Sequence, residues 1–168
     1  MSENHEVIES IRQEFAALKD LAERAASQLE DAAFFAALDA EANSVALLMK
    51  HVGGNLRSRW TEPFTTDGEK PDRHRDGEFE RAPDGSRGAV ERRWNDGWQV
   101  LFDTLGGARP DDLARPLRIR GQELTFARAL VRSLAHTAGH VHQIVMLARH
   151  WRGGAWQTLS LPRARPVR

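Results

Sequence analysis

Hydrophobic positions spaced three and four residues apart predict long amphipathic helices in four parts of the chain. Charged and polar residues fill the positions between them, so each helix has one face suited to a core. Ser44 is a suitable N-cap for the second helix, and Gly106 and Gly153 are suitable stops for the third and fourth. The predicted helices span approximately residues 4–29, 44–60, 86–105 and 125–151.

Three connecting stretches follow other patterns. Residues 31–38 are apolar and short enough for one or two helical turns. Residues 64–88 have no sustained apolar period, carry charges of both signs and contain several glycines and prolines. So long a connection is uncommon in a compact domain, and we interpret it as an ordered crossover, with a loose loop as the alternative. Residues 117–121 alternate and predict a short extended segment.

These elements predict an all-α fold, a four-helix bundle that forms one domain over residues 1–168. Short links favour antiparallel neighbours, whereas the long link between the second and third helices permits a crossover between parallel ones. We expect an ordered core over about residues 4–162, with frayed C-terminal residues beyond it.

Composition and charge exclude several classes of function. The 24 basic and 24 acidic residues give zero net charge, which argues against a nucleic-acid or anionic-membrane partner. No apolar run approaches the ~20 residues that span a bilayer, and the polar N-terminus does not resemble a signal peptide, so a cytoplasmic location is expected. The absence of cysteine and tyrosine excludes disulfides, thiolate ligands and phenol chemistry, leaving histidines and carboxylates as the main reactive groups.

Three histidines form a candidate metal site. His136 and His140 are four residues apart, so on a helix they lie only about 40° apart and one turn apart, on the flank of the apolar stripe. His142 points to the polar face, whereas His51 lies beside the apolar stripe of the second helix. Three imidazoles can bind Zn²⁺ or Ni²⁺ and leave a coordination position open, as catalytic sites do. The alternative is a chance pair among seven histidines.

The order of these motifs resembles the DinB/YfiT-like superfamily, especially its branch of small bacterial proteins of unassigned function. The likeness is carried by a histidine in the second helix and, far downstream, by His-x-x-x-His followed by Gln in the last helix. Residues that share it lie along nearly the whole chain, in segments 43–51, 54–60, 65–71, 75–80, 136–144 and 156–162.

The resemblance implies a bundle of up-down-down-up topology and a divalent metal, commonly zinc or nickel, at His51, His136 and His140. It also implies thiol-dependent transfer or isomerisation with bacillithiol or mycothiol, or hydrolysis, and a homodimer. One residue departs from the family pattern: His142 stands where the family usually has glycine. Because His142 faces away from the predicted ligands, we expect metal binding to be retained.

Two hypotheses about function follow. In the first, the protein is a metal-dependent transferase or hydrolase that activates water or an external low-molecular-weight thiol to attack a small electrophile. In the second, it is a non-catalytic dimeric bundle that binds a metal or small ligand. The candidates for substrate binding or proton transfer are Arg57, Arg59, Asp67, Glu69 and Glu78. The alternative is that these residues form ion pairs that tie the long connection to the bundle.

Overall fold

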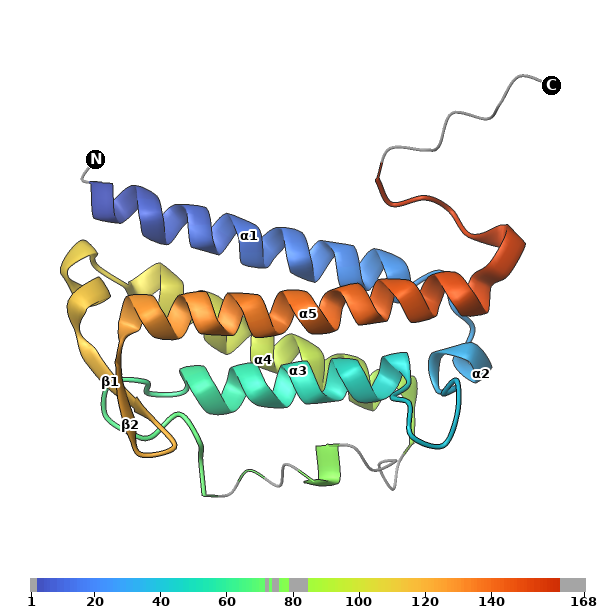
Figure 1. The fold of residues 1–168 in the computed structure, drawn as a ribbon, viewed down its shortest axis with the longest axis horizontal. Coiled ribbons are helices and arrows are strands. Elements are labelled where there is room, and N and C mark those ends of the chain that lie inside the picture. The colour runs from blue at the N-terminus through green and yellow to red at the C-terminus, as the bar shows by residue number, and fades with distance from the viewer. Residues whose placement is uncertain (1–2, 72, 74–75, 79–84, 161–168) are drawn as a thin grey trace.

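The computed structural model describes residues 3–71, 73, 76–78 and 85–160 (Figure 1). The described chain is mostly helical with a small two-stranded sheet, which confirms the predicted predominance of helices. No helix within these residues is long and apolar enough to cross a membrane. The helices are α1 (Glu3–Ala26), α2 (Asp31–Phe34), α3 (Val45–Trp60), α4 (Arg87–Gly107) and α5 (Phe126–Arg152), and the strands are β1 (Pro116–Ile119) and β2 (Gln122–Thr125).

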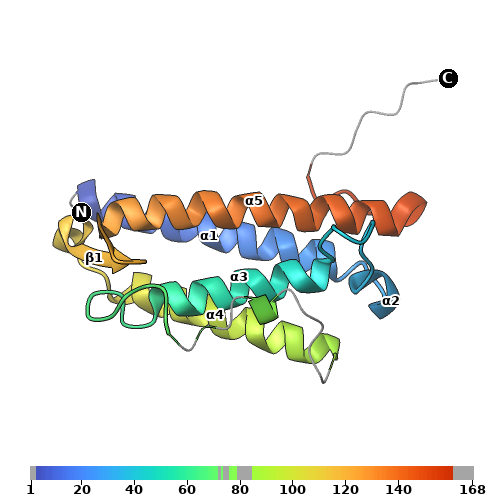
Figure 2. The same cartoon turned by 60° about the horizontal axis from the view of Figure 1, so that its bottom comes forward.

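The long helices lie side by side in two layers (Figure 2), α1 with α5 and α3 with α4, and α3 also contacts α5. Followed along the chain in Figure 1, α1 and α5 run in one direction and α3 and α4 in the opposite direction. Since α3 and α4 share a direction, the chain must return along the length of α3 before α4 begins. The predicted long connection lies at this place, and its residues 72, 74–75 and 79–84, with His74 and Phe79, lie outside the described residues.

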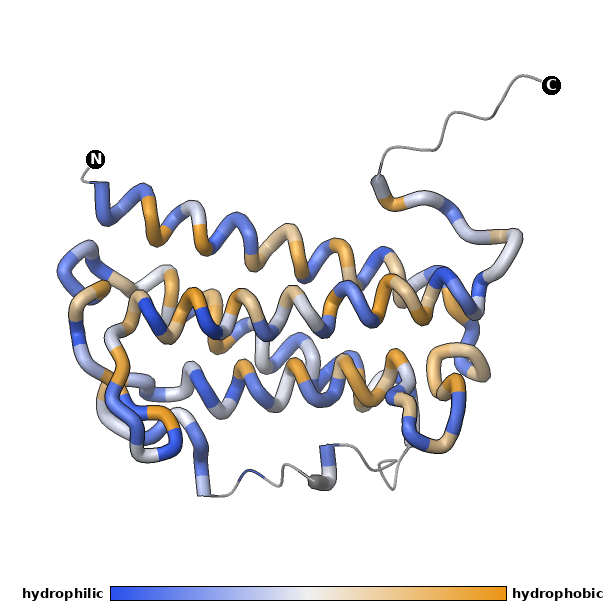
Figure 3. The backbone as a smooth tube through the Cα atoms, in the orientation of Figure 1, coloured by the Kyte–Doolittle hydropathy of each residue, from blue (hydrophilic) through white to orange (hydrophobic). Residues whose placement is uncertain are grey.

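Apolar side chains from all the long helices form one buried cluster. Figure 3 shows hydrophobic positions recurring along each long helix, as the spacing in the sequence predicts. Trp98 of α4 packs in T-shaped contacts against Phe15 of α1 and Trp94 of α4, with ring centroids 6.1 Å and 5.2 Å apart. These rings connect α4 to α1, so the two layers share one core.

The extended segment predicted over residues 117–121 is one strand and the turn of a hairpin. Arg120 and Gly121 form the two-residue turn with φ of 55° and 72°, the left-handed conformation that such hairpins require. The Asp67 carboxylate accepts hydrogen bonds from both turn amides, at 2.8 Å from Arg120 N and 2.7 Å from Gly121 N. The segment after α3 therefore holds the hairpin turn against the helices.

Two glycines allow α3 and α4 to approach each other closely. A Cβ atom on Gly97 would lie 2.1 Å from the carbonyl oxygen of Gly53, and a Cβ on Gly53 would lie 2.6 Å from that of Arg93. Since backbone atoms cannot move aside as a flexible side chain can, both positions require glycine. This contact fixes the position of α3, the helix that carries His51.

We expect Gly97→Ala to lower the free energy of unfolding by about 1–3 kcal/mol, because the added methyl group overpacks a contact between backbones. Gly139→Ala is the matched control: Gly139 is also in the middle of a helix, but its Cβ would meet nothing within 4 Å. Higher helix propensity should stabilise that variant by up to about 1 kcal/mol. Urea denaturation measures both changes, and equal effects of the two substitutions would disprove the close approach.

Candidate metal centre

His51 on α3 meets His136 and His140 on α5 where the two helices face each other. The Nε2 atom of His136 lies 3.5 Å from Nε2 of His51 and 3.3 Å from Nε2 of His140. The three ligand atoms all lie within 4.8 Å of one another. The three histidines that the sequence analysis named as candidates are therefore those that the structure brings together.

The helix that carries each histidine begins at a side-chain cap. Ser44 Oγ accepts a hydrogen bond from Leu47 N at 3.2 Å and starts α3, and Thr125 Oγ1 accepts from Arg128 N at 3.2 Å and starts α5. Each cap satisfies a backbone donor that the first turn leaves unpaired. Since both helices pack into the common core, the caps and the packing together set the height at which His51 faces α5.

A buried carboxylate binds the far side of the His51 ring. His51 Nδ1 lies 3.0 Å from Glu78 Oε2, and His51 and Glu78 side chains are 5% and 0% exposed. A carboxylate oxygen only accepts, so Nδ1 carries the proton and a neutral His51 presents the lone pair of Nε2 to the other histidines. Glu78 therefore selects the tautomer of His51 that can bind a metal.

Arg73 binds the same carboxylate through two N–H groups of its guanidinium. Arg73 Nε donates to Glu78 Oε1 at 2.9 Å and Nη2 donates to Oε2 at 2.8 Å. Burial by itself would raise the pKa of Glu78, but the hydrogen bonds from His51 and Arg73 hold it below its usual value. Glu78 therefore remains ionised behind His51.

The two histidines on α5 are held in the neutral form. Burial, followed by the charges of His140, His51, Arg59 and Arg73, lowers the pKa of His136 to about 4. Burial also lowers the pKa of His140, against the opposite effect of a hydrogen bond to Gln143 Oε1, 2.9 Å from His140 Nδ1. That oxygen accepts a hydrogen bond from Nδ1–H, so the neutral imidazole of His140 carries its proton on Nδ1 and leaves Nε2 unprotonated.

The spacing of the Nε2 atoms fits a metal ion. Zn²⁺ binds imidazole nitrogen at about 2.0–2.1 Å, which places tetrahedral ligands about 3.3 Å from one another. The distances of 3.3 and 3.5 Å from His136 Nε2 agree with this spacing. Among the described residues the group consists of the three histidines alone, without a carboxylate, so it could leave a coordination position open.

The predicted substrate-binding residues lie in different places. Arg59 lines a cavity beside the histidines, whereas Arg57 is exposed and lines a separate hollow formed with α4. Asp67 binds the hairpin turn, Glu69 lies 3.2 Å from Arg120 Nε and 3.6 Å from Arg73 Nη1, and Glu78 binds His51. Glu78 thus ties the connection to α3, as in the alternative interpretation, whereas Asp67 and Glu69 tie it to the hairpin turn. A role in substrate binding stays a prediction for all five.

Arg73 and Gly54 are important in the site and were not predicted. A Cβ on Gly54 would lie 2.2 Å from Glu78 Oε1, so a glycine is needed for Glu78 to reach His51. The adjacent pair Gly53-Gly54 inside a helix was a usable signal, because glycine is unfavourable there unless another group approaches closely. Arg73 had no such signal among the many charges of its segment. His142, as expected, is exposed, with Nδ1 2.8 Å from Ala138 O.

A family model described as "Protein of unknown function (DUF1572)" matches residues 2–165. The chain belongs to this family. No curated protein and no solved structure matches the chain. Membership of the DUF1572 family covers nearly the whole sequence but names no activity, so the DinB/YfiT-like assignment stays a prediction.

The lowered pKa of His136 predicts how stability depends on pH in metal-free protein. The unfolded imidazole takes up a proton near pH 6.5, whereas the folded one does so only near pH 4, so acid favours unfolding between these values. The stability due to neutral His136 is fully present above about pH 6.5 and lost as the pH falls toward 4. His136→Gln should therefore have a shallower loss of stability over this range.

The measurement is denaturant unfolding at several pH values with a chelator present. His150→Gln is the control, because His150 is an exposed histidine on the same helix. Parallel pH profiles for His136→Gln and the parent would show that His136 titrates normally in the folded state.

Proposed function

We propose that the protein is a divalent-metal-dependent enzyme with zinc or nickel at His51, His136 and His140. In this proposal it activates water or an external low-molecular-weight thiol to attack a small electrophile, as a transferase or hydrolase. The observation that carries the proposal is the convergence of the three histidines. One ligand atom of each lies within 4.8 Å of the others, and Nε2 of His136 lies at metal-ligand spacing from the Nε2 atoms of His51 and His140. The hydrogen bonds at Nδ1 of His51 and His140 add to it, because they leave both Nε2 atoms free to bind.

The chemistry follows from the small number of protein ligands. A divalent ion held by three imidazoles would lower the pKa of a bound water or thiol toward neutrality. The chain contributes the rest: Glu78 orients His51 and fixes its tautomer, and burial keeps His136 neutral. Because the sequence has no cysteine, a thiol nucleophile would come from outside the protein.

We also propose that the fold is the DinB-like four-helix bundle of up-down-down-up topology, as the sequence resemblance implies. The shared direction of α3 and α4, opposite to that of α1 and α5, supports this assignment (Figure 1). So does the long connection between α3 and α4. The homodimer implied by the same resemblance is part of this proposal and is tested by light scattering.

We expect the purified protein to hold one zinc or nickel ion per chain, and His136→Ala to lose it, because two imidazoles bind more weakly than three. His150→Ala is the control and should keep the metal, since His150 lies on the exposed face of α5. Elemental analysis after dialysis measures the stoichiometry. If neither the parent nor a metal-reconstituted form holds a stoichiometric ion, the metalloenzyme proposal fails.

Activity is tested on the metal-loaded protein with a low-molecular-weight thiol and an epoxide or alkyl halide, and in parallel without the thiol. A rate above background that disappears in His136→Ala supports a transferase, and substrate loss without the thiol supports a hydrolase. A metal-loaded protein without either rate supports the non-catalytic alternative, a bundle that binds a metal or small ligand.

Glu78→Gln should weaken metal binding by about 10–100-fold, as loss of a carboxylate behind a ligating histidine typically does. The amide keeps the shape of the side chain but removes the charge that fixes the His51 tautomer. Glu69→Gln is the matched control, because Glu69 also pairs with Arg73 but does not touch His51. Competition with a chromogenic chelator measures both affinities, and equal affinities would show that Glu78 only supports the fold.

A further inference from the structure

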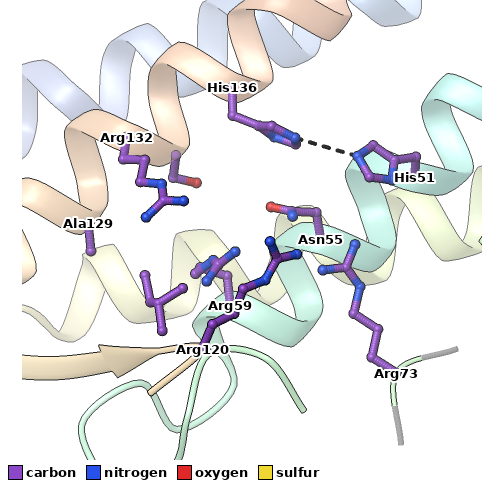
Figure 4. Close-up of a pocket in the computed structure, with 10 residues that line it drawn as sticks. His51, Asn55, Arg59, Arg73, Arg120, Ala129, Arg132 and His136 are labelled. Atoms are coloured by element: carbon purple, nitrogen blue, oxygen red, sulfur yellow. Dashed lines mark hydrogen bonds between the residues drawn. The ribbon is translucent and has the colours of Figure 1, made fainter. Parts of the chain in front are cut away.

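A cavity of about 160 Å³ lies beside the histidine cluster. His51 and His136 form part of its wall, as Figure 4 shows, so a molecule in the cavity would lie next to the proposed metal site. A volume of about 150 Å³ holds a molecule of the size of benzene, so the cavity suits one end of a small substrate. Its polar lining, apart from the histidines, includes Asn55, Arg59, Arg73, Arg120 and Arg132.

The arginines come from four separate parts of the fold. Arg59 is on α3, Arg73 on the long connection, Arg120 in the hairpin turn and Arg132 on α5. Arg120 and Arg132 are exposed, whereas the Arg73 side chain is only 4% exposed. The cavity thus has positive charge both at its entrance and in its interior.

Carboxylates offset only part of this charge. Glu78 pairs with Arg73, and Glu69 lies near both Arg73 and Arg120. Within the described part of the chain, neither Arg59 nor Arg132 forms an ion pair. Four guanidinium groups therefore face two carboxylates, which leaves an excess of two positive charges around the cavity.

Several donors at the cavity have no hydrogen-bond acceptor among the described residues, although Arg73 Nη1 lies 3.6 Å from Glu69 Oε2. Nη1 of Arg59 and Nη1 of Arg73 are buried without a hydrogen bond. Asn55 is 8% exposed, and its side chain lines the cavity without a hydrogen bond to a described atom. Burying such groups is costly unless they gain a partner, so their arrangement favours an acceptor that carries negative charge.

The electrostatics at Arg59 agree with this interpretation. Burial has the largest effect on the pKa of Arg59, and the attraction of Glu69 opposes it. Smaller repulsions from Arg73, Arg132 and Arg120 add to burial, and the pKa of Arg59 is lowered to about 10. Arg59 still carries its charge at neutral pH. An anion among these arginines would relieve both the repulsion and the loss of hydration.

We propose that this cavity binds an oxyanion group, a carboxylate or a phosphate, with Arg59 and Arg132 as its charge partners and Arg73 Nη1 and Asn55 as further donors. Guanidinium groups suit both anions, because their planar N–H pairs match the spacing of the oxygen atoms. The class of substrate that this cavity implies rests on the proposed function. That substrate would be a small anion whose reactive end lies at the histidines. Anion binding itself requires no metal.

The test is a titration of ¹⁵N-labelled, metal-free full-length protein with inorganic phosphate and, separately, with acetate at constant ionic strength. The signals of the Asn55 side-chain amide and of arginine Nε–H report binding at the cavity. Saturable shifts are expected with at least one anion, and the one that binds identifies a phosphate or a carboxylate as the group recognised. No saturable shift with either anion overturns the proposal.

Arg59→Gln and Arg132→Gln should each weaken binding by about tenfold or more, since a charged hydrogen-bond partner is lost. Arg132 is exposed, so its variant should fold even if the Arg59 variant does not. Arg57→Gln is the control, because Arg57 is on the same helix as Arg59 but lines a different hollow. Unchanged affinity in both cavity variants, or an equal loss in Arg57→Gln, contradicts the proposal.

Zinc titration of Arg132→Gln separates this inference from the proposed function. Arg132 is not a metal ligand in the proposal, so the variant should bind zinc as the parent does. Anion binding without metal binding would leave the cavity as a binding site and remove the enzyme proposal. Metal binding without anion binding would remove only the anionic substrate.

Discussion

The ionised carboxylate of Glu78 is the constraint on which the arrangement of the site depends. A fully buried charge costs several kcal/mol unless charged and hydrogen-bonding partners surround it. Glu78 is 0% exposed, and its partners are Arg73 and His51. Glu78 and Arg73 belong to the connection, whereas His51 belongs to α3. The hydrogen bond between Glu78 and His51 therefore determines how the connection lies on α3. It also determines which nitrogen of His51 faces α5.

The charges around the histidines are arranged asymmetrically. The negative carboxylate of Glu78 lies behind His51. Arginines line the cavity beside His51 and His136 (Figure 4), and one of them, Arg73, also pairs with Glu78. Burial and the neighbouring positive groups both disfavour protonation of His136. The same surroundings that keep His136 neutral would therefore attract an anion toward it, so the two proposals draw on one electrostatic arrangement.

The sequence predicted those features that depend on neighbours within one helix. The apolar spacing located the long helices, and the angle of about 100° per residue separated His136 and His140 from His142. The first helix ends at Ala26 rather than near residue 29, because the chain tightens there into hydrogen bonds between Gln28 N and Ala25 O and between Leu29 N and Ala26 O. The second strand of the hairpin, Arg73 and Gly54 depend on contacts between distant segments, so helical periodicity contained no signal for them.

The common direction of α3 and α4 has a consequence for how such a site can diversify. An antiparallel pair would need only a short hairpin between its helices, whereas this pair requires a segment that travels back past the middle of α3. That segment is where Arg73 and Glu78 reach the cluster, while the core is built by the helices. Substitutions at Arg73 and Glu78 can therefore alter the environment of His51 without changing a residue of the hydrophobic core.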